Sequence, residues 1–135
     1  MSSARGEIFY ATAIADIDEI FERLEAEGFD AAYIWPSPFT YGYRAWIAAA
    51  GLKHHVPTIS EGSDDVRAGV LLSYGLDDTR IQQSAAEYVD KLLRGAKPAD
   101  LPLQQPTKLE MVINLRVAKA LGLTSRNRSC SAPTR

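Results

Sequence analysis

The spacing of apolar residues changes repeatedly in the first half of the chain, and each change predicts a new element. Residues 7–12 predict a short strand. The next segment, 17–24, carries its apolar side chains at the spacing of one helical face. Asp16 and Glu19 predict a capping box at the start of this helix, and Gly28 is expected to end it.

The same order is repeated further along. The apolar run 31–35 predicts a second strand, which Pro36 and Pro38 end, and a third strand is expected near residues 56–59. Between them, Tyr43, Trp46, Ile47 and Ala50 mark a helix that is predicted to end at Gly51. Strand and helix alternate with a repeat of about 25 residues, which is typical of right-handed parallel βαβ units. The predicted fold class is therefore α/β with a Rossmann-like parallel sheet.

The second half predicts a different order. Residues 69–74 predict a fourth strand, and a long amphipathic helix follows that closes at Gly95. The segment 97–106 contains three prolines and is expected to be an extended connector. Residues 109–113 predict a final strand. Asn114 is a suitable cap for a short helix over 115–121, which Gly122 ends.

Composition narrows the class of protein. The chain has 135 residues, enough for one domain with a core, and a net charge of −2 from 15 cations and 17 anions spread along it. This even distribution gives no basic stripe for nucleic acid. No apolar run reaches the roughly 18 residues of a membrane span, and the first ten residues do not have the apolar core of a signal peptide. The single cysteine, Cys130, excludes an internal disulfide and a cysteine-based metal cluster.

Residues 70–124 contain a series of short motifs in a fixed order: LSYG at 72–75, YVDK at 88–91, GAKPADLP at 95–102, QPTK at 105–108 and VINL at 112–115. In these motifs the chain resembles the closing segment of the ABC-type substrate-binding proteins, two-lobed receptors that deliver a small solute to a membrane permease. The resemblance implies a periplasmic-binding-protein-like fold of type I, a small-molecule solute as ligand, an ABC permease as partner and a periplasmic location.

Members of this family are much longer, so the resemblance implies part of one lobe and the crossover back to the other. Residues 1–60 would form most of the second half of the C-terminal lobe, and 61–124 would return across the hinge. Residues 125–135 depart from the family pattern and predict a disordered tail. The helix and strand beyond Tyr74 would leave apolar surface exposed, which favours homodimerisation, strand exchange or marginal stability.

Two predicted loops are candidates for a binding site, because ligands of open parallel sheets bind beyond the carboxyl ends of the strands. In the first, prolines stiffen a turn that carries Trp35, Ser37 and Phe39. Apolar walls beside a few polar groups suit a small amphiphile such as an amino acid. The alternative is that Trp35 and Phe39 are core residues and that the prolines only end a strand.

The second loop contains Ser60, Glu61 and Ser63. The Glu61 carboxylate is placed to meet an α-ammonium group, with the hydroxyls as further acceptors. The alternative for Glu61 is a solvated loop acid. Tyr74, at the end of the fourth strand, either faces the cleft between the lobes or packs under the connector.

Other chemistry finds little support. His54 and His55 are adjacent, so their side chains point apart, and no third metal ligand has a useful spacing; surface histidines are predicted and no metal site. Dinucleotide, phosphate-loop and nucleophile-elbow motifs are absent, which predicts neither an enzyme nor a cofactor. The predicted function is solute capture for an ABC importer. Alternatives are the ligand-sensing effector domain of a regulator, which would need a basic helix-turn-helix, or a truncated product that binds nothing.

Overall fold

A single four-stranded sheet organises the chain. The computed structural model describes residues 6–76, 78–102 and 108–123, and its strands lie in the order β1-β2-β3-β4. β1 (Ala32–Tyr33), β2 (Thr58–Ser60) and β3 (Leu72–Leu76) are parallel, whereas β4 (Leu109–Ile113) is antiparallel to β3. This arrangement confirms the predicted α/β class with its mostly parallel sheet.

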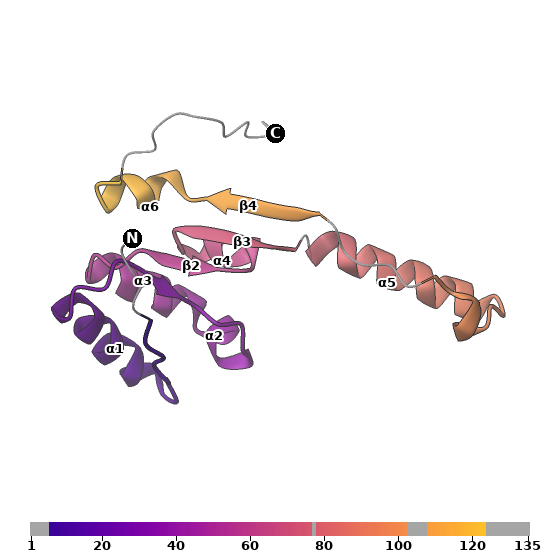
Figure 1. The fold of residues 1–135 in the computed structure, drawn as a ribbon, viewed down its shortest axis with the longest axis horizontal. Helices are drawn as coiled ribbons and strands as arrows, with labels where there is room; N and C mark the ends of the chain where they lie inside the picture. The colour runs from indigo at the N-terminus through magenta and orange to yellow at the C-terminus, as the bar shows by residue number, and fades with distance from the viewer. Residues whose placement is uncertain (1–5, 77, 103–107, 124–135) are drawn as a thin grey trace.

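Helices connect the strands of the sheet. α1, α2 and α3 gather together in Figure 1, and α5 projects away from them. We call residues 6–76 the body and residues 78–102 the arm. The helical bounds are α1 Ile14–Ala26, α2 Pro38–Gly42, α3 Arg44–Lys53, α4 Ser63–Ala68, α5 Asp78–Leu93 and α6 Leu115–Ala120, with a 3₁₀ turn, η1, at Pro98–Asp100.

The core lies between α1 and α3. Ile17, Phe21 and Leu24 of α1 are 4%, 4% and 5% exposed, and they form one cluster with Ile47 and other residues of α3 and the segment before β2. These α1 residues are the face that the sequence spacing predicted. Burial of this face supplies most of the stability that such a helix gains in a protein.

The prediction of a strand at residues 7–12 was wrong. Phe9 and Ala11 pack against the core while Ile8 and Tyr10 are exposed, so the alternation of a strand is present. Residues 7–12 nevertheless belong to no strand of the described sheet. A strand is defined by its backbone ladder, and side-chain alternation alone does not provide a partner.

The start of α1 also differs from the prediction. Asp16 is the third residue of the helix, and its carboxylate accepts hydrogen bonds from the backbone N–H groups of Thr12 and Ala13 at 2.7 and 2.9 Å. These bonds lower the pKa of Asp16. The end of the helix is as predicted, because Gly28 takes a left-handed φ of 71° just beyond it.

Gly51 does not end its helix, as had been predicted, since α3 continues to Lys53. The glycine lies where α3 meets the chain leading into β2. A Cβ atom at this position would be 2.6 Å from Cγ2 of Thr58 and 3.0 Å from the carbonyl oxygen of Val56. Gly51 therefore permits a close approach of helix and strand.

His54 is buried, which corrects the prediction of two surface histidines; only His55 is exposed. The Nδ1 atom of His54 lies 2.9 Å from Oε2 of Glu25, and the Nε2 atom of His54 lies 3.0 Å from Oδ1 of Asp18. Hydrogen bonds to Glu25 and Asp18 raise the pKa of His54. Asp18 also accepts from Lys53, and the hydrogen bonds from Lys53 and His54 lower the pKa of Asp18. The cluster joins α1 to the end of α3.

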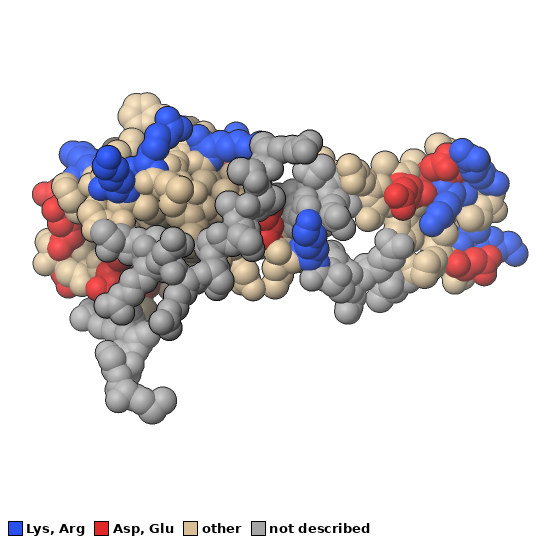
Figure 2. Space-filling model, turned by 90° about the horizontal axis from the view of Figure 1, so that it is seen from above, with Lys and Arg blue, Asp and Glu red and all other residues tan. Residues whose placement is uncertain are grey.

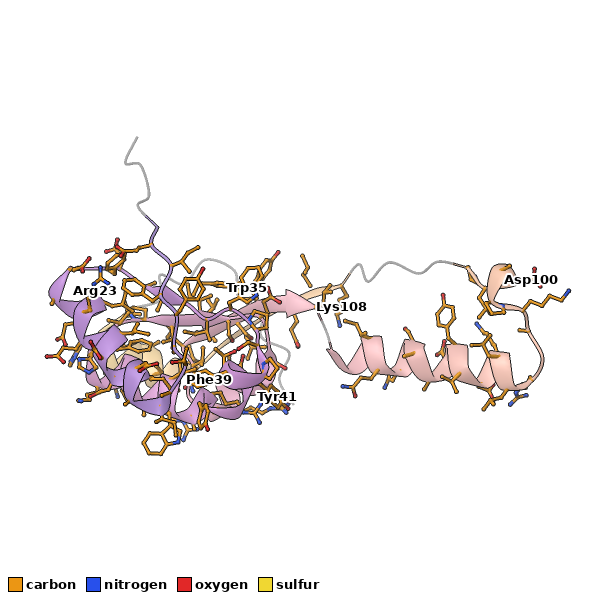
Figure 3. All side chains as sticks on the ribbon, turned by 90° about the horizontal axis from the view of Figure 1, so that it is seen from below. Arg23, Trp35, Phe39, Tyr41, Asp100 and Lys108 are labelled. Atoms are coloured by element: carbon orange, nitrogen blue, oxygen red, sulfur yellow. The ribbon has the colours of Figure 1, made fainter. Side chains whose placement is uncertain are left out.

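The arm has no comparable packing. Val89 is 54% exposed and Leu93 84%, and no described side chain of the arm is buried. Figure 2 shows charged side chains of both signs gathered at its far end, and Figure 3 places Asp100 there and Lys108 where the chain re-enters the sheet. The Tyr88 hydroxyl donates to the Pro102 carbonyl and closes the arm on itself. The expected exposed apolar surface beyond Tyr74 is therefore confirmed.

Several predictions in the second half are confirmed in outline. Gly95, with a φ of 94°, follows the end of α5, and Asn114 accepts hydrogen bonds from two N–H groups at the start of α6. The connector differs, because its residues Pro98–Asp100 form a 3₁₀ turn. Its remainder at 103–106 and the predicted tail 125–135 lie outside the described residues. The boundary predicted after residue 60 falls between β2 and α4, and the sheet continues across it.

Candidate functional site

A pocket of about 360 Å³ lies beyond the carboxyl ends of β1 and β2. Its walls come from the segment after β1, from α2 and the first turn of α3, and from the segment after β2 with the start of α4. The two loops selected from the sequence thus meet at one cavity. Side chains with polar groups in its lining are Ser37, Thr40, Tyr41, Arg44, Glu61 and Asp65.

Ser37 is held by a reciprocal cap at the start of α2. Its hydroxyl accepts from the Thr40 N–H at 3.1 Å, and its own N–H donates to the Thr40 hydroxyl at 2.8 Å. The Thr40 hydroxyl also donates to the carbonyl of Trp35 at 2.9 Å. Pro38 occupies the first helical position, where a missing N–H costs nothing. The two hydroxyls are therefore fixed in place at the pocket wall.

Trp35 and Phe39 have different environments. Trp35 is 72% exposed, and its ring meets that of Tyr33 edge-on with centroids 6.2 Å apart. Phe39 is half-buried against the core, with its ring centroid 4.8 Å from that of Tyr43. Figure 3 shows the two side chains in separate parts of the body, and neither lines the pocket. The structure places Trp35 on the surface and Phe39 under the loop.

Glu61 lies at the pocket, and its carboxylate accepts a hydrogen bond of 2.6 Å from the Tyr33 hydroxyl. This bond, together with burial and the negative charge, raises the pKa of Tyr33 to about 12. Ser60 is 1% exposed and donates to the Gly62 carbonyl at 3.4 Å, so it supports the loop from within. Tyr74 is 54% exposed on β3 and does not line the pocket.

Gly75 explains how β3 accommodates the Glu61 loop. A Cβ atom at Gly75 would collide with the carbonyl oxygen of Glu61. The LSYG motif therefore has a steric role beside the site, because only glycine lets the two backbones come so close.

Sequence reasoning did not select four polar residues of the pocket. Thr40, Tyr41, Arg44 and Asp65 all line it. The guanidinium carbon of Arg44 lies 4.3 Å from the centre of the Tyr41 ring, a cation–π contact. A usable signal was present, since Arg44 begins the helix after the proline loop and helix starts face the same edge of the sheet as that loop.

Within the described residues, no helix has the length and apolarity that crossing a bilayer would require.

Three solved structures share this fold. A conserved domain protein from Vibrio cholerae O1 biovar El Tor is 25% identical, with a TM-score of 0.73 over 87% of this chain and 39% of that one. The ABC domain from Streptococcus pneumonia in complex with L-Trp is 21% identical, with a TM-score of 0.70 over 84% of this chain and 39% of that one. A ligand-free, open substrate binding protein with adhesive properties from Clostridium difficile is 19% identical, with a TM-score of 0.65 over 87% and 39%.

The chain thus spans 39% of the length of each of these structures, and the two under 25% identity speak for the fold alone. No curated protein matches the sequence significantly. A family profile described as ABC transporter substrate binding protein matches residues 7–134, nearly the whole chain. The fold is therefore periplasmic-binding-protein-like, as the motifs implied, and the chain belongs to the ABC transporter substrate-binding protein family.

Proposed function

We propose that this chain forms part of one lobe of a receptor that captures a small amphiphilic solute, such as an amino acid, for an ABC importer. The observation that carries the proposal is that both predicted loops meet at one pocket, at the carboxyl ends of two adjacent parallel strands. Family membership supports the class of function. The Streptococcus pneumonia neighbour was solved with L-Trp, an amino acid of the kind proposed.

The proposed roles follow from the position of each side chain. Glu61 meets the ammonium group of the solute, and Ser37 offers a hydroxyl from the opposite wall. Trp35, exposed beside the loop, covers an apolar part of the solute when the site closes. Phe39 and Ser60 act indirectly, since they hold the two loops in place.

Closure is the proposed mechanism. The pocket is one wall of a cleft, and a second lobe supplies the other wall together with Tyr74 at the crossover. Binding selects the closed form, which the permease recognises at the periplasmic or outer face of the membrane. A single lobe makes only part of the contacts, so we expect this chain alone to bind its solute weakly, with a dissociation constant of about 1 mM or above.

An NMR titration of the isotope-labelled chain with a panel of amino acids tests this proposal. We expect saturable shift changes confined to the amides of residues 35–44 and 61–65. Glu61→Gln should abolish them, and Glu87→Gln, which alters an exposed carboxylate of the arm, should not. Shift changes scattered over the surface, or none at all with any solute, would contradict the proposed site.

A further inference from the structure

Arg44 is a cation in the pocket wall that has no counter-ion among the described residues. Its Nη1 atom is buried and makes no hydrogen bond within the part of the chain that the structure describes. A guanidinium is charged at every pH a protein meets, and a buried charged donor without a partner is unfavourable. Such a group is most simply explained by a partner that arrives from outside.

The helix that carries Arg44 adds to the uncompensated positive charge at this wall of the pocket. Arg44 is the first residue of α3, and the first turn of this helix contains no acidic residue. The amino end of a helix carries a partial positive charge, which disfavours a cation and favours an anion. Two positive contributions therefore coincide at one wall of the pocket, and an anion bound there would be stabilised by both.

The guanidinium is also oriented. Its carbon lies 4.3 Å from the centre of the Tyr41 ring, so one face of the planar group is covered. The edge of a guanidinium fork matches the two oxygens of a carboxylate. The two acidic residues of the pocket do not pair with this guanidinium. The Glu61 carboxylate accepts a hydrogen bond from the Tyr33 hydroxyl, and no ion pair joins Asp65 to Arg44 in the described chain.

Charges of both signs thus line one small cavity, with Arg44 on the α3 side and Glu61 and Asp65 on the other. We propose that Arg44 binds a carboxylate of the solute and that the two acids bind its ammonium group. The solute is then a zwitterion with both groups close together, an α-amino acid, and neither a neutral sugar nor a simple cation. A volume of about 360 Å³ lies at the small end of the usual range for ligand pockets.

This inference rests on the proposed function and is tested by solutes that differ in a single group. The titration is repeated with an amino acid, its carboxamide and its deaminated acid. We expect the parent amino acid to bind the wild-type chain about tenfold or more tightly than the carboxamide, because only the carboxylate can pair with Arg44.

The variants Arg44→Met and Arg44→Lys complete the test, with Arg67→Gln as the matched control. Arg67 is an exposed arginine of α4 that pairs with Asp64 and lies outside the pocket. Arg44→Met should reduce binding of the amino acid to the level of the carboxamide and leave carboxamide binding unchanged. Arg44→Lys should fall between, and Arg67→Gln should match the wild type.

An independent readout uses no solute. Because Arg44→Met removes a cation whose Nη1 atom is buried without a partner among the described residues, the melting temperature of this variant without ligand should equal or exceed that of the wild type, which also shows that the variant folds. A marked loss of stability would mean that Arg44 has a structural role. Equal binding of carboxamide and amino acid in this pocket would overturn the role of Arg44 and leave the proposed function standing. No binding of any solute by the wild type would overturn both.

Discussion

Two helices of similar amphipathic pattern, α1 and α5, differ in whether their apolar faces are buried. The apolar face of α1 is the core of the body, with Phe21 only 4% exposed. The apolar face of α5 is open along the arm, where Leu93 is 84% exposed. An amphipathic pattern therefore predicts that a helix needs an apolar partner, but it does not say where that partner is.

The contrast has an energetic meaning. A buried side chain of α1 contributes to the stability of the whole body, whereas an exposed one on α5 contributes little until something covers it. The arm is held in its described form by local contacts, among them the Tyr88 hydroxyl on the Pro102 carbonyl and the pair of Arg94 with Asp90. Mutations can sharpen this comparison or break it.

The largest effect is expected from Phe21→Ala. Loss of a fully packed ring should lower the free energy of unfolding by about 3–5 kcal/mol, while Leu93→Ala in the arm should change it by less than about 0.5 kcal/mol. Urea denaturation followed by circular dichroism measures both. Similar losses for the two variants would show that the arm is packed in solution, for example against a second copy of the chain.

A smaller effect is expected from Gly51→Ala. The added methyl group would meet Thr58 and the Val56 carbonyl, so α3 must move away from β2, at a cost of about 1–3 kcal/mol in unfolding free energy. The matched change in the arm is Gly95→Ala, where nothing lies within 4 Å and only the left-handed φ of 94° is strained. Hydrogen exchange should increase in α3 for the first variant and only at the end of α5 for the second. Unchanged exchange in α3 would contradict the close approach.

The smallest expected effect is a pH dependence confined to the body. Since the hydrogen bonds that His54 makes to Glu25 and Asp18 raise the pKa of His54, their stabilisation is complete below the usual histidine pKa of about 6.5 and is lost as the pH rises through the raised value. The melting temperature of the wild type should therefore be lower at pH 9 than at pH 6. His54→Gln should reduce the fall, and His55→Asn should preserve it; an equal fall in all three proteins would exclude His54 as the cause.

The sequence was a good guide where a local rule is sufficient. The face of α1, the end of that helix at Gly28 and the cap of α6 by Asn114 each depend on residues a few positions apart. The errors concern long-range partners. Residues 7–12 have a strand-like alternation without a partner strand in the described sheet. His54 is buried against α1, whose Asp18 and Glu25 contact it directly although they lie 36 and 29 residues away in the sequence.

The candidate site shows the same division. The rule about the carboxyl ends of strands found both loops of the pocket, with Ser37 and Glu61 among its lining residues. It did not select Arg44, although its place at the start of a helix was a usable signal; that its Nη1 atom has no partner among the described residues is known only from the structure. The roles of the predicted residues stay proposals for the titrations to test.

The pairing of β3 with β4 has a mechanical consequence. Leu76 is the register partner of Leu109, so the arm leaves and re-enters the sheet at adjacent points of one ladder. A torque on the arm is therefore delivered to β3, whose Gly75 lies directly against the carbonyl of Glu61. A displacement of the arm would therefore be felt first at the backbone of Glu61, on the edge of the pocket.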